Sequence, residues 1–310
     1  MSGLSGYLVR RIAQFVPTAF GVLTLVFFLV HLVPGDPVEV MLGETAQPAD
    51  KEALRHALGL DLPLHEQYFR FLGGVLKLDL GDSFFYRKPV ASLILERLPA
   101  TAELAAAAML LALAIAFPLG TISALKRASV WDRSAMVAAL LGVSIPNFWL
   151  GPMLIYAFSI KFQWFPASGR GGLAHLVLPA ITLGTALAGI LSRMIRASVL
   201  EVLREDFILF AKARRIPKHR FVIHYLLRPA LIPVVTIVAL QLGALFSGAV
   251  ITETVFSWPG LGTLFLNAVF SRDFPLIQGL VLFFAMFYLV ANLLADISYA
   301  ILDPRVRLGG

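Results

Sequence analysis

Apolar residues dominate six long runs of this chain, and polar residues gather between them. None of the runs contains Asp, Glu, Lys or Arg; they cover residues 12–35, 104–125, 134–160, 171–192, 229–252 and 274–295. A helix of about 20 residues crosses the roughly 30 Å apolar core of a bilayer, and every run reaches that length. The pattern predicts an all-α polytopic membrane protein with six transmembrane helices, in which residues 1–310 form one transmembrane domain.

Composition supports this prediction. Hydrophobic residues make up 58% of the chain and charged residues 15%, whereas soluble domains carry about 25% charged residues. The first run follows Arg10 and Arg11, as a secretory signal would, but such signals have an apolar stretch of only about 7 to 15 residues. We therefore expect a retained first span. No cysteine occurs, which excludes disulfides and thiol-bound metals.

Basic residues gather on one side of the predicted membrane. Six spans place both ends of the chain on the same side, and 16 of the 26 Lys and Arg residues lie there. Because short cytoplasmic connections carry an excess of Lys and Arg, we expect both termini in the cytoplasm. The net charge of +7 then lies mostly beside the inner leaflet, where it favours contacts with lipid and partner proteins and not with nucleic acid.

The longest polar segment, 33–100, falls on the outer side. Apolar residues recur in it at helical spacing: Leu54 and Leu58, then Leu64, Tyr68, Phe71, Leu72 and Val75. We predict an outer helical insertion between spans 1 and 2. Two roles are open for it, a structural lid on the spans and a docking site for an external partner.

On the inner side, residues 193–228 have the pattern of a helix-turn-helix. Apolar residues from Val199 to Ala211 recur at roughly helical spacing, which predicts an amphipathic helix that extends the fourth span. Pro217 disfavours helix at Ile216 and so breaks it, and Phe221 to Leu226 line a second short helix. Such an element fits either a rigid knob that docks into a soluble protein or a basic helix that lies on anionic lipid.

Few ionisable side chains lie near the spans, where a charge is costly and usually faces a cavity or a partner. His31, Glu103 and Asp296 lie at predicted span ends, where a structural role is favoured. Glu253 precedes the helix-breaking stretch 257–260, and it either lines an outer gate or makes a structural hydrogen bond in a buried turn. The other candidates for the translocation path or gate, or for polar contacts between helices, are Ser144, Asn147, Gln241, Ser247 and Trp258.

Several motifs, in the same order along nearly the whole chain, resemble the permease subunits of ABC importers for dipeptides and oligopeptides, within the binding-protein-dependent permeases. They include Tyr7 to Arg11, His31 to Pro37, Ile145 to Phe148, Glu205 to Phe207, Arg228 to Thr236, Thr252 to Gly262 and Asp303 to Arg305. The resemblance implies a MetI-like permease fold in a bacterial inner membrane. It also implies three kinds of partner: a second homologous permease, two cytoplasmic ATPase subunits that bind ATP and Mg, and an external substrate-binding protein.

The same resemblance implies that segment 193–228 couples the permease to the ATPases. The family pattern Ala-x-Ala-x-Gly at the end of its first helix aligns with Ala211 to Arg215, so an arginine replaces the glycine. Glycine accepts left-handed backbone geometry without strain, whereas arginine there costs on the order of 1 kcal/mol, and we expect an altered turn. The implied coupling residues are Glu205, Asp206, Ala211, Ala213, Arg215, Pro217 and Arg220.

Motifs for chemistry are missing from the chain. No phosphate-binding G-x-x-x-x-G-K-[ST], metalloprotease H-E-x-x-H or nucleophile elbow G-x-S-x-G occurs. We expect a transport subunit without a cofactor of its own and with ATP hydrolysis in partner chains. The resemblance implies di- or oligopeptides as substrates, with glutathione and nickel chelates as alternatives. A secondary transporter that works without ATP is disfavoured by the few mid-span charges and by the lack of a convincing internal repeat.

Overall fold

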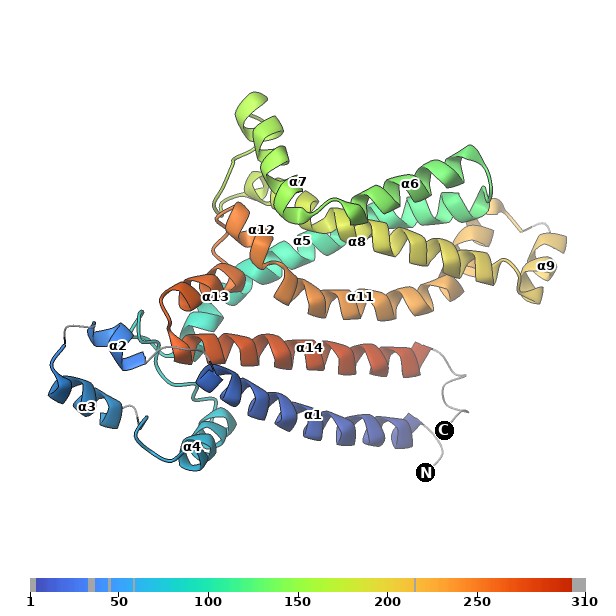
Figure 1. The fold of residues 1–310 in the computed structure, drawn as a ribbon. Helices are drawn as coiled ribbons and strands as arrows, with labels where there is room; N and C mark the ends of the chain where they lie inside the picture. Colours follow the sequence, from blue (N-terminus) through green and yellow to red (C-terminus); the bar gives the residue numbers. More distant parts are fainter. Residues whose placement is uncertain (1–3, 33–36, 44–45, 58, 215, 303–310) are drawn as a thin grey trace.

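Long helices lying side by side form the body of the computed structural model (Figure 1). The structure describes residues 4–32, 37–43, 46–57, 59–214 and 216–302. Within these residues, four helices are long and apolar enough to cross a membrane unbroken: α1 (Leu4–Leu32), α5 (Val90–Leu125), α8 (Leu173–Val202) and α14 (Phe274–Leu302). They correspond to the first, second, fourth and sixth predicted runs.

The two other predicted spans are bent. α6 (Val130–Ser144) meets α7 (Asn147–Leu154) and the π-helix η1 (Ile155–Lys161) at 98°. The second bent span starts with the π-helix η2 (Phe221–Leu227) and continues into α11 (Arg228–Gly248). It bends by 53° at Pro233, inside α11. Counting each bent pair as one span gives six. Proline explains both bends, because its ring removes an amide hydrogen and disfavours helix at the residue before it.

The segment between α1 and α5 forms three short helices at one end of the bundle: α2 (Pro37–Leu42), α3 (Pro48–Ala57) and α4 (Leu64–Leu76) (Figure 1). Tyr68 and Phe71 of α4 pack against Phe27 of α1, with ring centroids 5.2 and 5.7 Å apart. α5 begins at Val90, so the last residues of the predicted insertion 33–100 belong to the second span. Leu58 lies outside the described residues.

Two short helices, α12 (Val250–Val255) and α13 (Leu261–Phe270), lie at the same end, between α11 and α14 (Figure 1). At the opposite end lie the start of α1, the end of α14, and α9 (Asp206–Ala213), which precedes the single turn α10 (Lys218–Arg220). By the expected orientation the first end is the outer end and the second the inner end, and these two names are used below.

One sequence prediction for the inner end is wrong. The amphipathic pattern predicted a single helix from the fourth span through Ala211, but α8 ends at Val202 and a turn over 203–205 separates it from α9. An acidic residue stabilises the positive N-terminal end of a helix, and Asp206 lies in the first turn of α9, so a new helix is favoured there. Arg215 lies outside the described residues, which leaves the predicted altered turn as a prediction.

The centre of the bundle depends on close contact between α5 and α8. A Cβ added at Gly184 would lie 2.8 Å from the carbonyl oxygen of Ala108, and one at Gly120 would lie 2.7 Å from that of Ser192. Small residues let helix backbones approach this closely, which is how helices pack in a membrane, where lipid is as apolar as the side chains. α6 and α11 pack against this pair, and α14 and then α1 follow on the side of α11.

Candidate functional site

At the inner end, α9 presents an apolar face to its surroundings. Ile208 and Ala211 are buried against the rest of the chain, whereas Leu209 and Phe210 are 64% and 72% exposed. A hollow of about 450 Å³ lies beside them, lined by Asp206, Leu209, Phe210 and Ala213. A short helix that is anchored on one side and apolar on the other has the features of a docking surface.

The other residues predicted for this surface lie around α9. Glu205, Pro217 and Arg220 are exposed in the segments that flank it, and Asp206 and Ala213 are exposed at its two ends. Pro217 accepts a hydrogen bond from the amide of Phe221 at 2.9 Å and so begins the next helical stretch. The turn between the two helices includes Arg215 and is not described in full.

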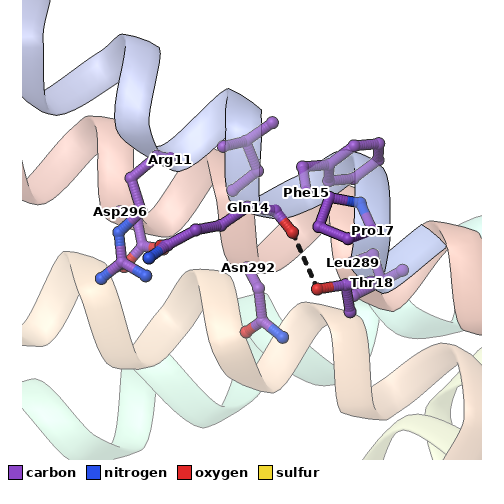
Figure 2. A pocket seen from close by; sticks show the side chains of 9 residues that line it. Arg11, Gln14, Phe15, Pro17, Thr18, Leu289, Asn292 and Asp296 are labelled. Atoms are coloured by element: carbon purple, nitrogen blue, oxygen red, sulfur yellow. Dashed lines mark hydrogen bonds and ion pairs between the residues drawn. The ribbon is translucent and has the colours of Figure 1, made fainter. Parts of the chain in front are cut away.

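A polar groove runs between α1 and α14 near the inner end (Figure 2). The Arg11 guanidinium lies 3.3 Å from the Asp296 carboxylate, which agrees with the structural role favoured for Asp296. The groove has a volume of about 450 Å³ and is lined by Arg11, Gln14, Phe15, Pro17, Thr18, Leu289, Asn292, Leu293 and Asp296.

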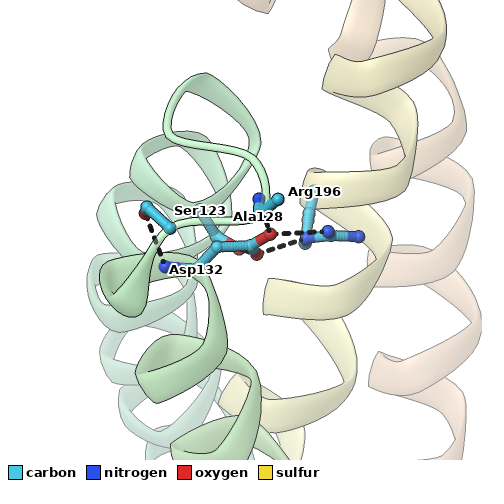
Figure 3. Close-up of polar contacts among 5 residues, drawn as sticks. Ser123, Ala128, Asp132 and Arg196 are labelled. Carbon is cyan, nitrogen blue, oxygen red and sulfur yellow. Dashed lines mark hydrogen bonds and ion pairs between the residues drawn. The ribbon is translucent and has the colours of Figure 1, made fainter.

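A buried carboxylate fastens the loop between α5 and α6 to α8 (Figure 3). Asp132 is 4% exposed and accepts two hydrogen bonds from the Arg196 guanidinium, at 2.7 and 2.9 Å. The amide of Ala128 and the hydroxyl of Ser123 also donate to it. A charge-assisted, bidentate pair of this kind fixes geometry as well as adding energy. The sequence predicted no role for Asp132, although Ser129, whose hydroxyl accepts from the amide of Asp132, marks a helix start.

At the outer end, Glu253 makes the structural hydrogen bonds that were one of its two predicted roles. It is fully buried, and it accepts from the hydroxyl of Thr101 on α5 at 2.6 Å and from the amide of Thr263 on α13 at 3.0 Å. A Cβ at Gly260 would collide with this carboxylate, so glycine is required there. Burial raises the pKa of Glu253 above its usual range, and the hydrogen bonds from Thr101 and Thr263 oppose that shift.

Trp258 belongs to the same turn. Its indole is fully buried and donates to the carbonyl oxygen of Ala100 at 2.8 Å. The geometry of Glu253 and Trp258 therefore favours a role in holding α12 and α13 onto α5 over direct contact with a passing solute.

A second buried carboxylate at the outer end was also not predicted from the sequence. Asp273, between α13 and α14, accepts from the Ser83 hydroxyl at 2.5 Å and from the amides of Phe84 and Phe85 at 3.1 Å. It ties the loop before α5 to the start of α14.

The bend between α6 and α7 brings two predicted path residues together. Ser144 is exposed and Asn147 half-buried on either side of Pro146. In the described part of the chain, the carbonyls of Gly142, Val143 and Ser144 accept no hydrogen bond from the amides that follow α6. Gln241 lies apart from them, half-buried in α11; Ser247 is in the same helix, and its side chain is outside what the structure describes.

Comparison with known proteins identifies the family. The model of the "binding-protein-dependent transport system inner membrane component" matches residues 116–308, and the model of the N-terminal part of this membrane component matches residues 4–105. The chain belongs to this family. The resemblance seen in its motifs is thereby confirmed, and so is the expectation of a membrane-embedded transport component.

Curated relatives match the permease over nearly its whole length. It is 41% identical to the di/tripeptide transport system permease protein DppB of Pseudomonas aeruginosa and 40% identical to the dipeptide transport system permease protein DppB of Escherichia coli. It is also 40% identical to the glutathione transport system permease protein GsiC of Pectobacterium atrosepticum. In each case the alignment covers 97% of this chain and 98% of the relative.

A solved structure confirms the predicted fold class. A chain of the MetNI methionine ABC transporter, in inward-facing conformations, superposes on the permease with a TM-score of 0.57, covering 68% of this chain and 96% of that chain. At 18% sequence identity the likeness concerns the fold alone.

The Asp132–Arg196 pair yields a stability prediction. Asp132→Ala should lower the stability of the permease by about 3 kcal/mol, because removing one partner of a buried pair leaves the other charge uncompensated. Thermal unfolding of the purified protein in detergent measures the effect. Glu103→Ala is the control, because its pair with Arg170 is well exposed, at 36% and 39%, and is worth about 0 to 1 kcal/mol. Equal melting temperatures for the two variants would contradict the assigned role of Asp132.

Proposed function

We propose that this chain is the permease subunit of an ATP-driven importer that carries dipeptides or oligopeptides across the bacterial inner membrane, with both termini in the cytoplasm. The single observation that supports the substrate class best is the set of peptide permeases that match nearly the full chain at about 40% identity. Glutathione, itself a small peptide, is the second candidate, because a glutathione permease matches at a similar level.

The proposed complex contains a second homologous permease, two ATPase subunits and an external substrate-binding protein. The exposed apolar face of α9 supports an ATPase contact at the inner end. Leu209 and Phe210 would fill a cleft in the ATPase, while the buried Ile208 and Ala211 keep α9 fixed to the permease. A rigid knob of this kind transmits displacement, which a loosely held loop does not. Energy from ATP bound with Mg in the partner would enter the permease here.

The bend at Pro146 supports a place for the translocation path. Non-helical backbone at membrane depth is tolerated only where protein buries it or where it lines a water-filled cavity. Val143, Ser144 and Pro146 are exposed in the isolated chain, so protein of this chain does not cover the bend. We therefore place Ser144 and Asn147 on the water-filled path between the two permeases, with Gln241 and Ser247 as less direct candidates. Glu253 and Trp258, which are buried, would act on the gate only by holding the outer turn in place.

The substrate proposal is tested through the external binding protein of the same transport system. Its purification without refolding, followed by mass spectrometry of the released ligand, should recover short peptides, because a tight-binding receptor retains its ligand. Recovery of reduced or oxidised glutathione alone would select the second candidate. Recovery of a sugar or an inorganic ion would contradict the peptide class.

The α9 proposal predicts uncoupling without unfolding. Leu209→Ala combined with Phe210→Ala should weaken ATPase binding at least about tenfold, since buried aromatic anchors are typical interface hot spots. The amount of ATPase that co-purifies and the ATP-driven uptake into vesicles should both fall, while the permease still inserts and melts normally. Val130→Ala, which truncates a side chain 76% exposed at the same end, is the matched control. Unchanged co-purification would exclude α9 as the contact.

The path proposal is tested by thiol labelling of this subunit, which needs no background substitutions in this chain because it has no cysteine. In the complete importer, Ser144→Cys and Asn147→Cys should react with a membrane-impermeant thiol reagent, since only a hydrated thiol forms the reactive thiolate. Leu25→Cys, on the apolar outer face of α1 and 62% exposed in the isolated chain, should stay unlabelled in the bilayer. Protection at both bend positions, with or without ATP, would place the bend outside the path.

A further inference from the structure

The groove between α1 and α14 has features that neither the bundle nor the proposed transport path explains. α1 lies at the edge of the molecule and packs against α14 (Figure 1), and only 17% of the most apolar stretch of each of these two helices is buried. The groove is therefore open to whatever surrounds the chain. Its lining is nevertheless polar at several positions, which is costly on a face that meets hydrocarbon.

The polar groups change with depth in the same way on both helices. α1 rises from the inner end and α14 returns to it, so Arg11 lies opposite Asp296 and Gln14 lies near the level of Asn292 (Figure 2). At 1.5 Å per residue, Gln14 is about 4.5 Å deeper than Arg11, and Asn292 is about 6 Å deeper than Asp296. Phe15, Leu289 and Leu293 supply apolar walls. Charges at the rim, amides below them and apolar side chains at the walls match the polarity profile of a phospholipid.

Within the described residues, neither the Gln14 nor the Asn292 side-chain amide makes a hydrogen bond, and the Thr18 hydroxyl donates to the Gln14 backbone carbonyl at 2.8 Å. Both amides lie within three residues of the end of an apolar run, at the boundary between headgroups and hydrocarbon, where a donor without a partner is costly. The ester carbonyls and phosphate of a lipid lie at the depth of these amides and would accept their hydrogen bonds.

The rim charges specify the headgroup. Arg11 and Asp296 form a pair at 3.3 Å, and their side chains remain 41% and 34% exposed. A guanidinium beside a carboxylate presents one site for a phosphate and one for an ammonium group. An anionic headgroup without an amine would meet the Asp296 carboxylate as a like charge. We propose that this groove binds a zwitterionic phospholipid with a primary ammonium headgroup, that is, phosphatidylethanolamine.

In this assignment the lipid phosphate accepts from Arg11, its ester oxygens accept from Gln14 and Asn292, and its ammonium donates to Asp296. The bound lipid completes the seam between the first and the last span. The conclusion that this lipid comes from the inner leaflet depends on the proposed orientation of the termini. The choice of headgroup does not depend on it.

The test uses the complete importer purified in mild detergent, with retained lipids measured by native mass spectrometry. The importer is also reconstituted in nanodiscs that contain equal amounts of phosphatidylethanolamine, phosphatidylcholine and phosphatidylglycerol. The wild type should retain phosphatidylethanolamine over the other two. The double variant Gln14→Leu, Asn292→Leu fills the groove with apolar side chains and leaves the rim pair in place. It should reduce the retention of phosphatidylethanolamine about tenfold, because the hydrogen bonds from both amides to the lipid are lost.

Asp296→Asn provides the sharper test because it removes the negative charge that would bind the ammonium, and with it the ion pair to Arg11, without changing the size of the side chain. It should shift the preference from phosphatidylethanolamine to phosphatidylglycerol, since Arg11 remains. Asn267→Leu, which replaces an exposed amide on α13 at the other end of the bundle, is the matched control and should behave as the wild type.

Three results would overturn the proposal. Equal retention by the wild type, the groove-filling variant and the control would show that lipid binds elsewhere. A wild-type preference for phosphatidylglycerol would contradict the role of Asp296. A Gln14→Cys thiol that cross-links to the second permease, without retained lipid, would show that a protein covers the groove. None of these results bears on whether the importer carries peptides, which the ligand of the binding protein tests separately.

Discussion

Within the apolar layer of a membrane, each backbone amide and carbonyl must find a hydrogen bond inside the protein, and the whole fold depends on this constraint. Unbroken helices meet it directly, as α1, α5, α8 and α14 do. The close approach of α5 and α8 at Gly120 and Gly184 then supplies packing where no hydrophobic effect drives helices together. Departures from regular helix are informative because they need a local explanation, and the bend at Pro146 is the largest, at 98°.

The loops at both ends depend on buried carboxylates. Asp132 holds the inner loop between α5 and α6 against α8. At the outer end, Glu253 joins α12 and α13 to α5, and Asp273 joins the loop before α5 to α14. Asp132 and Asp273 each accept at least three hydrogen bonds and Glu253 accepts two, and a buried polar group of this kind is tolerated only when it is hydrogen-bonded. A mechanism that opens either end has to move these joined elements as units.

Some of this structure could be predicted from the sequence, and the reason is physical. The positions of the spans follow from runs without charge, and α3 and α4 follow from helical periodicity, because both signals are local. The turn that ends α8 at Val202 could not be predicted, because the apolar spacing continues through it and only the charge of Asp206 favours a new helix. The pairing of Asp132 with Arg196 joins residues 64 positions apart, and no local pattern specifies which partner an ionisable residue will meet. The role of Glu253 was left with two alternatives for the same reason.

The contacts define a mechanical route through the permease. A displacement of α9, which the proposed ATPase contact would produce, reaches α8 through the short turn over 203–205. Arg196 lies less than two turns before the end of α8 and is held to Asp132 by two short hydrogen bonds, so α6 must follow α8. α6 leads to the bend at Pro146, where the proposed path residues lie. α5 packs along α8 and carries Thr101, which holds Glu253 at the outer end. The pair of α5 and α8 thus connects the inner docking surface with both the bend and the outer turn. Because this connection is rigid, a movement at one face of the membrane can change the geometry at the other.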